Sequence, residues 1–339
     1  MAHFTRYRLE FCAPLHLAGR GVGIERSELT VRSDTLFSAL CAALAATHGR
    51  STVDDLLEWF REGLTPFALS STFPWVGETF LLPRPRMVPP GGPARRARWL
   101  SAAVLAGLLR GEPPDDAEGP LDLGAEATAW LLPAERQTLN GRLCWAVCTV
   151  PRVTVDRQTS ASAVYRAGRT VFGPDAGLYF LVDWRDRAWE PALTEALAYL
   201  AEAGLGGERS AGHGQFRMRA PEEVEIPDAP ESPFRFTLAL YYPSEAEIRA
   251  GALDPPAAYD LETRRGWMTD LAGGGRWRKT VRMLAEGALV KNVGPIAGEL
   301  ADVTPDGYAE HRVIRCGLTP TLGVRPTTLE MLTPAGGDA

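Results

Sequence analysis

The segment Gly204-Leu-Gly-Gly-Glu-Arg-Ser-Ala-Gly-His-Gly214 places five glycines within eleven residues. A helical pattern precedes this segment and a short extended pattern follows it, so it is predicted to connect a helix to a strand. Glycine adopts positive φ and lets the backbone approach a ligand closely, and amide N–H groups exposed in this way suit phosphate oxygens. Arg209, Ser210 and His213 add side-chain donors. A tight connection without a ligand is the alternative, although it needs only one or two glycines.

The loop differs from the common nucleotide-binding motifs. It contains no Gly-Lys-Ser/Thr run, so it is not a P-loop. It leaves a helix rather than opening one, and its glycine spacing does not fit the dinucleotide-binding fingerprint. The loop is therefore a candidate phosphate contact outside both classes.

Further elements are predicted on both sides of the loop. Pro191 suits the first turn of the preceding helix, which Gly204 ends. Strands are predicted at 177–183 and 215–219. Near the N-terminus, alternation over residues 6–11 indicates a half-buried strand. Ser33 or Asp34 is predicted to cap the next helix, which ends near Gly49, and a second short helix and extended structure follow at 54–61 and 67–83.

The order strand–helix–strands–strand–helix–strand predicts a ferredoxin-like (RRM-like) βαββαβ domain over residues 1–220. Residues 84–150, rich in proline, glycine and arginine, are expected to be an irregular insertion. The acidic stretch 221–233 is expected to be a linker. Alternation that resumes at Phe234 opens a second, degenerate ferredoxin-like domain over 234–339. The fold class is α+β.

Composition places the chain among ordinary globular proteins. It has 339 residues, of which 45% are hydrophobic and 23% charged. No apolar run is long enough to span a membrane, and the N-terminus lacks the apolar core of a signal peptide, so a cytoplasmic protein is expected. Five scattered cysteines do not fit a zinc site. Neither a metal nor a cofactor is predicted.

Charge is unevenly distributed along the chain. The net charge of −6 is unusual for a polyanion-binding protein. However, residues 84–98 hold five arginines and no acid, and residues 142–169 hold five arginines against Asp156 alone. The acidic residues gather in 112–126 and 222–231. This segregation favours one face for a phosphate backbone and another for solvent or a protein partner. Chance clustering in loops is the alternative.

At the glycine-rich loop the sequence resembles the RAMP proteins, the ferredoxin-like RNA binders of CRISPR systems. Among them it is most similar to the family of subunit four of the type III-A effector, the Csm complex. The similar segments are Ala13–Leu17, Gly21–Glu25, Arg32–Leu40, Ser70–Trp75, Val153–Ser162 and His311–Gly317. Ile314 departs from the family, which usually has a tyrosine there. The resemblance spans most of residues 4–325 and is weakest in 84–150 and 243–280.

The resemblance implies two RAMP domains with long insertions and a thumb-like β-hairpin at 151–172. It further implies a non-catalytic subunit that binds the 5′ handle of the CRISPR RNA (crRNA). That subunit joins the large polymerase-cyclase subunit to the backbone RAMP subunit and meets target RNA only indirectly. RNA contacts are expected at the loop 20–32 with the helix start, at 152–169 and at the glycine-rich loop. The candidate RNA-binding residues are His16, Arg20, Gly21, Arg26, Arg32, Ser33, Arg152, Arg157, Thr159, Ser162, Gly206, Gly207, Arg209, Ser210, Gly212 and His213.

Two other functions stay open from the sequence. Some RAMP relatives cleave CRISPR repeat RNA with a histidine as general acid or base, and here His16 and His213 lie in suitable loops. Neither histidine has an evident partner base, so a contact or structural role is favoured over an endoribonuclease. A purely structural subunit that joins larger partners is the remaining alternative.

Overall fold

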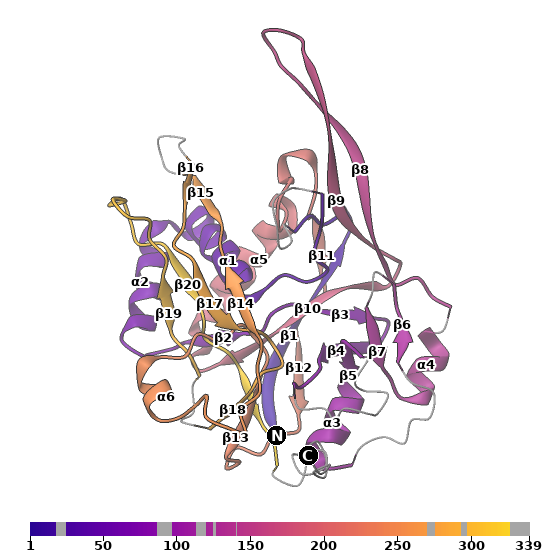
Figure 1. Cartoon of the computed structure of the whole chain (residues 1–339), viewed down its shortest axis with the longest axis vertical. Helices are drawn as coiled ribbons and strands as arrows, with labels where there is room; N and C mark the ends of the chain where they lie inside the picture. Colours follow the sequence, from indigo (N-terminus) through magenta and orange to yellow (C-terminus); the bar gives the residue numbers. More distant parts are fainter. Residues whose placement is uncertain are drawn as a thin grey trace, which may run out of the picture.

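The computed structural model describes residues 1–17, 25–86, 97–112, 120–124, 127–139, 141–269, 275–292 and 297–325. It is a mixed α+β fold, as predicted (Figure 1). No helix in these ranges is long and apolar enough to cross a membrane. Within the same ranges, no group of three or more His, Cys, Asp or Glu side chains is arranged to hold a metal ion.

The main sheet contains ten strands among the described residues. Its principal path runs β11-β1-β10-β3-β4-β5-β7-β6, with β12 also paired to β1 and β2 to β10. The strands are Ala2–Phe11 (β1), Phe67–Leu69 (β2), Phe73–Val76 (β3), Thr79–Pro83 (β4), Trp99–Ser101 (β5), Leu121–Asp122 (β6), Thr128–Trp130 (β7), Ala176–Trp184 (β10), Phe216–Met218 (β11) and Glu222–Ile226 (β12).

Two helices pack on one face of this sheet. Tyr7 of β1 stacks on Phe180 of β10 with ring centroids 5.2 Å apart, and both are buried with Leu36 and Leu197 of the two helices. These are α1 (Ser33–His48) and α5 (Glu190–Ala203), so strands and helices follow one another in the predicted order. The other helices are α2 (Arg50–Arg61), α3 (Ala102–Arg110), α4 (Pro133–Leu139) and α6 (Glu245–Arg249), with 3-10 turns η2 (Arg187–Trp189) and η3 (Arg209–Ala211).

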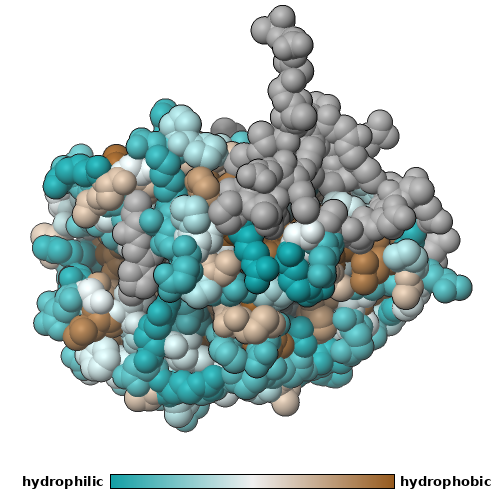
Figure 2. All heavy atoms as spheres, turned by 90° about the horizontal axis from the view of Figure 1, so that it is seen from below, coloured by the Kyte–Doolittle hydropathy of each residue, from teal (hydrophilic) through white to brown (hydrophobic). Residues whose placement is uncertain are grey.

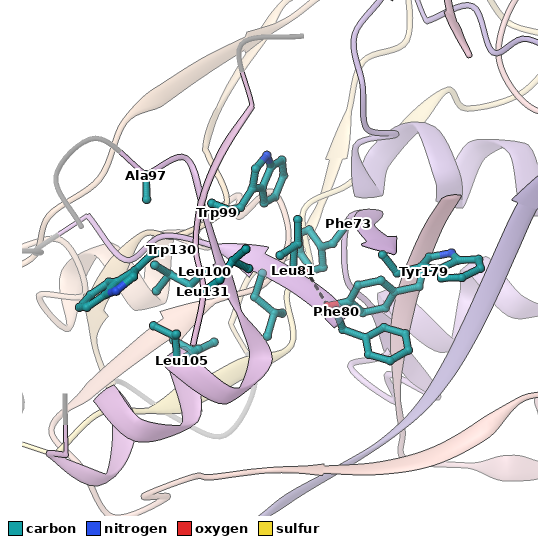
Figure 3. Packing of buried hydrophobic residues seen from close by; sticks show 14 of the residues in the cluster. Phe73, Phe80, Leu81, Ala97, Trp99, Leu100, Leu105, Trp130, Leu131 and Tyr179 are labelled. Carbon is teal, nitrogen blue, oxygen red and sulfur yellow. Dashed lines mark hydrogen bonds between the residues drawn. The ribbon is translucent and has the colours of Figure 1, made fainter. Parts of the chain in front are cut away.

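Part of the segment 84–150, expected to be irregular, is ordered and extends the sheet. Trp99 and Leu100 of β5, with Leu105 of α3, pack in a cluster that continues to Tyr179 of β10 (Figure 3). The Tyr179 hydroxyl donates to the carbonyl of Leu81 at 2.8 Å. The run Trp-Leu-Ser-Ala-Ala-Val-Leu-Ala-Gly-Leu-Leu at 99–109 is apolar enough to bury against the sheet, a signal that the surrounding proline and glycine obscured.

The first half of the segment expected to be a linker is also a strand. Residues 222–226 form β12, which pairs antiparallel with β1 over Ala2–Arg6. Glu222 accepts hydrogen bonds from Arg6 and Arg8. Glu222 therefore complements two arginines of the neighbouring strand, whereas Glu223 and Glu225 are exposed. The division of the chain into domains at this stretch stays a prediction.

Strands β8 (Trp145–Val155) and β9 (Ser162–Phe172) form a long antiparallel ribbon. Every residue of β8 pairs with one of β9, from Trp145 opposite Phe172 to Val155 opposite Ser162. In Figure 1 the ribbon extends well beyond the rest of the molecule. The hairpin begins several residues before position 151, where it was expected to start.

The C-terminal part contains small sheets. Its strands are β13 (Phe234–Thr237) with β18 (Leu289–Lys291) and β21 (Thr321–Gly323), β14 (Leu261–Arg264) with β17 (Val281–Leu284), β15 (Trp267–Thr269) with β16 (Gly275–Trp277), and β19 (Leu300–Asp302) with β20 (Ile314–Cys316). Among the described residues after 233 the one α-helix is the five-residue α6. A second ferredoxin-like unit stays a prediction.

A buried carboxylate joins this C-terminal part to α1. Asp34 is fully buried and accepts hydrogen bonds from Arg264 of β14, at 2.9 and 3.0 Å, and from Arg315 of β20. Burial alone would raise the pKa of Asp34, but the charges and hydrogen bonds of Arg264 and Arg315 outweigh it and hold this pKa below its ordinary value. The predicted capping role is wrong, because Arg32 is the N-cap and its side chain makes no capping hydrogen bond.

We expect Asp34→Asn to lower the free energy of unfolding by about 3–5 kcal/mol, because it leaves the buried Arg315 and the half-buried Arg264 without their counter-charge. Chemical denaturation of the full chain measures this. Asp54→Asn is the matched control, since the Asp54 side chain is 67% exposed and lies 4.0 Å from Arg50. The control should change stability by less than about 1 kcal/mol. Equal effects of the two substitutions would contradict the structural role of Asp34.

Candidate RNA-binding surface

The glycine-rich loop connects α5 to β11 and folds back on itself. Gly204, Gly206, Gly212 and Gly214 all adopt positive φ, between 79° and 92°. A Cβ placed on Gly206 would lie 2.5 Å from the carbonyl oxygen of His16, and one on Gly207 would lie 2.9 Å from Cδ2 of the same residue. Close packing against His16 therefore requires glycine at these two positions, and their contact with RNA stays a prediction.

The loop is anchored to the segment that follows β1. The amide of Gly207 donates to the carbonyl of His16 at 2.9 Å, and the amide of Gly214 donates to that of Pro14 at 2.8 Å. Both amides are therefore used internally. The outer part of the loop differs, because Arg209, Ser210 and Gly212 are exposed and a Cβ on Gly212 would meet no atom within 4 Å.

The base of the β8–β9 hairpin lies against the same segment. Leu15 and Thr170 exchange backbone hydrogen bonds of 2.8 and 2.7 Å. His16 is buried, and its Nδ1 lies 2.6 Å from the carbonyl oxygen of Gly168. A Cβ on Gly168 would lie 2.6 Å from the carbonyl carbon of Arg26, so the chain at Arg26 crosses the hairpin closely. Three segments far apart in sequence thus converge at the hairpin base.

A side-chain contact ties the hairpin to the glycine-rich loop. Arg152 of β8 donates to Nε2 of His213 at 3.0 Å. His213 is buried, and this burial, followed by the charge of Arg152, lowers its pKa from the ordinary value. Its Nδ1 has no hydrogen-bond partner among the described residues. The imidazole is therefore held neutral and orients Arg152.

The hairpin tip carries the remaining candidates. Arg157, Thr159 and Ser162 are exposed. The Asp156 carboxylate accepts from the amides of Gln158 and Thr159, at 2.8 and 2.7 Å, and from the Thr159 hydroxyl at 3.0 Å. Asp156 therefore stabilises the turn. Its pKa is lowered by the Thr159 and Gln158 amides.

Two predicted residues, Arg32 and Ser33, are held by other protein groups. Ser33 is buried, with its amide donating to Ser71 Oγ at 2.8 Å and its hydroxyl accepting from the Leu240 amide at 3.1 Å. Arg32 pairs with Glu286 and lies 3.7 Å from Glu28. The predicted phosphate contact at the α1 N-terminus stays a prediction; in this structure Ser71 and Glu286 hold Ser33 and Arg32. Arg20 and Gly21 lie outside the described residues.

The sequence did not single out Gly168 or Arg166. Gly168 lies in an otherwise alternating strand, and an isolated strand glycine signals close backbone approach. Arg166 is exposed on β9, opposite Pro151. It belongs to the basic cluster 142–169, which was noted without a residue-level assignment.

Comparison with known proteins places this geometry in a family. A family profile described as "CRISPR Csm4 C-terminal domain" matches residues 231–324. The chain is 31% identical to the CRISPR system Cms protein Csm4 of Thermococcus onnurineus over 306 residues, 88% of this chain and 93% of the relative. It is 26% identical to the Csm4 protein of Mycobacterium tuberculosis over 73% of this chain and 74% of the relative. The chain therefore belongs to the Csm4 family, as the sequence resemblance predicted.

Solved structures share the fold. A Csm1–Csm4 cassette in complex with cA4 matches with a TM-score of 0.61 at 22% identity, over 98% of this chain and all of that chain. A Csm3–Csm4 subcomplex of a type III-A CRISPR-Cas interference complex matches with a TM-score of 0.63 at 18% identity, over 96% of this chain and all of that chain. At these identities the likeness shows the fold alone.

Gly206 and Gly212 provide a test of the loop geometry. Both have positive φ, so alanine costs about 1–2 kcal/mol of backbone strain at either position. Gly206→Ala should cost a further 1–3 kcal/mol or so, because its Cβ meets the His16 carbonyl. Denaturation of both variants measures the difference, and equal losses would contradict the close packing at Gly206.

Proposed function

We propose that this chain is a non-catalytic subunit of a type III-A CRISPR (Csm) interference complex, acting in antiviral defence in the cytoplasm. In this proposal it binds the 5′ handle of the crRNA and joins the large polymerase-cyclase subunit to the backbone RAMP subunit. The convergence of the glycine-rich loop, the segment after β1 and the hairpin base carries the proposal. Family membership supports it.

Arginines supply the positive charge of this surface. Arg26, Arg157, Arg166 and Arg209 are exposed and make no ion pair with the residues that the structure describes. A guanidinium presents a planar set of donors that matches a phosphate. By contrast, Arg32 is neutralised inside the protein. The negative net charge of the whole chain is therefore compatible with a basic local surface.

The outer half of the hairpin supports a contact near the junction of guide and target RNA. Val153 and Val164 lie directly opposite each other and are 57% and 72% exposed, and Val155 is 62% exposed. Water does not stabilise exposed aliphatic side chains, and such side chains are suited to van der Waals contact with a base or a sugar. Handling of target RNA at this position is the proposed role of the hairpin.

The geometry gives no support to the alternative, an endoribonuclease that processes repeat RNA. His16 and His213 are buried, and their rings contact the Gly168 carbonyl and the Arg152 guanidinium. Neither histidine hydrogen-bonds a carboxylate among the described residues. A general base needs reach to the proton it removes, and the buried imidazoles are instead held by neighbouring segments.

The partner assignment rests on the relatives. Solved structures contain Csm4 proteins with Csm1 and with Csm3, and the same two associations are proposed for this chain. On the face seen in Figure 2, hydrophobic residues are scattered among hydrophilic ones outside the grey atoms. A protein contact on that part of the surface would be polar and sensitive to salt.

Removal of Arg209 tests RNA binding. Arg209→Ala should weaken binding of a labelled RNA carrying the host's 5′ handle by about 1–3 kcal/mol, the scale of a hydrogen bond to a charged group. Filter binding at fixed salt measures this. Arg249→Ala is the control, because Arg249 is 69% exposed in its side chain and lies on α6. Equal affinity of the native chain and Arg209→Ala would count against the loop as an RNA contact.

Association with the two subunits tests the bridging role. At micromolar concentration the chain should co-elute with the large subunit in size-exclusion chromatography, and guide RNA should strengthen assembly with the backbone subunit. The same RNA, incubated with the chain and magnesium, should remain intact. Separate elution under all conditions would contradict the bridging role. A cleavage product formed by the native chain but not by His213→Ala would favour the endoribonuclease.

A further inference from the structure

Two exposed tryptophans face each other on the short ribbon β15–β16. Trp267 and Trp277 are directly opposite in the strand register. Their ring centroids are 4.4 Å apart with an interplanar angle of 36°, and they are 55% and 59% exposed. The next most exposed tryptophan, Trp59, is 38% exposed and packs edge-on against Trp189. The ribbon therefore presents more aromatic surface than any other tryptophan site in the chain.

Packing within the ribbon explains only part of this arrangement. The Trp267 ring covers the backbone of Gly275, since a Cβ there would lie 2.9 Å from Cζ3 of the indole. The ring covers the strand backbone at Gly275, as aromatic side chains often do beside glycines in edge strands. Trp277 has no such role and keeps more than half of its surface exposed. Burial of a tryptophan contributes more apolar area than burial of most residues, so this exposed, tilted pair offers a large apolar surface to a ligand.

The surroundings of the pair are basic. Residues 263–282 contain six basic residues against Asp270 alone. Arg264 pairs with Asp34, and Lys279 lies 2.9 Å from Asp306. Arg265, Arg276 and Arg282 are exposed around the ribbon. Aromatic rings within a basic surface are the arrangement by which proteins hold single-stranded nucleic acid, with bases stacked on the rings and arginines at the backbone.

We propose that Trp267 and Trp277 bind unpaired bases of single-stranded RNA, at a contact separate from the glycine-rich loop and the hairpin. This inference rests on the proposed function. Protein interfaces are also enriched in tryptophan and arginine, so RNA is favoured by the six-to-one excess of basic over acidic residues in 263–282, and a protein partner is an outcome of the test. In Figure 1 the ribbon lies toward the same end of the long axis as the hairpin.

The test uses the full chain, single-stranded A20 RNA and the same oligomer with abasic nucleotides. The double variant Trp267→Ala/Trp277→Ala should bind A20 roughly ten-fold more weakly than the native chain, the effect of losing about one stacked base. It should bind the abasic RNA as the native chain does. The Phe/Phe double variant should restore most of the A20 affinity, and Trp59→Ala should leave it unchanged.

The outcomes separate this proposal from the proposed function. If the Ala/Ala variant binds A20 normally while Arg209→Ala binds weakly, the ribbon contact is wrong and the loop contact stands. A ten-fold loss on both RNAs would overturn base stacking. Normal RNA binding with lost co-elution of the large or backbone subunit would assign the pair to a protein instead. If the Ala/Ala variant fails to fold, Phe/Phe and Arg282→Ala replace it. Full A20 affinity of Arg282→Ala would then oppose the proposal.

Discussion

The ion pairs of buried Asp34 set the position of the C-terminal part against the first helix. A buried carboxylate is costly unless it is paired and hydrogen-bonded. Asp34 has no exposed surface and reaches Arg264 and Arg315, residues 230 and 281 positions away in the chain. The charge of Asp34 is therefore neutralised only when β14 and β20 lie beside α1. The ribbon β15–β16 begins three residues after Arg264, so its placement depends on the same contact.

A second polar cluster reinforces the first and closes the N-terminus of α1. Glu286 pairs with Arg32 and accepts from the Ser71 hydroxyl, while Ser71 Oγ accepts from the amide of Ser33. A helix N-terminus attracts anions because its first amides lack partners. Here the protein supplies those partners, and Glu286 supplies the anion. The helix start that resembles an RNA contact in sequence thus joins the N-terminal part of the chain to the C-terminal part.

Local sequence predicted those parts of the fold that depend on local rules. Pro191 and Gly204 mark the ends of α5, and alternation marks β1. Strand β12 was missed because its acidic residues look solvated unless the arginines of β1 are known to lie beside them. The partners of Arg32, Ser33 and Asp34 were missed for the same reason. Each partner lies too far along the chain for any periodic pattern to report it.

At the candidate surface too, the sequence indicated which residue types matter but not which groups they contact. Glycine density predicted close backbone approach, and Gly206 and Gly207 do approach another group, but that group is His16. Both histidines are placed by other segments and hold the surface together. The side chains available for the proposed RNA contact are arginines without internal counter-charges, such as Arg157 and Arg209. Because acids such as Glu222 and Glu286 pair with Arg6, Arg8 and Arg32, away from the hairpin, the net charge of −6 describes the whole molecule and not the field near the hairpin. Screening over about 10 Å at ordinary salt makes the local arginines, rather than the distant acids, decide how a phosphate is held.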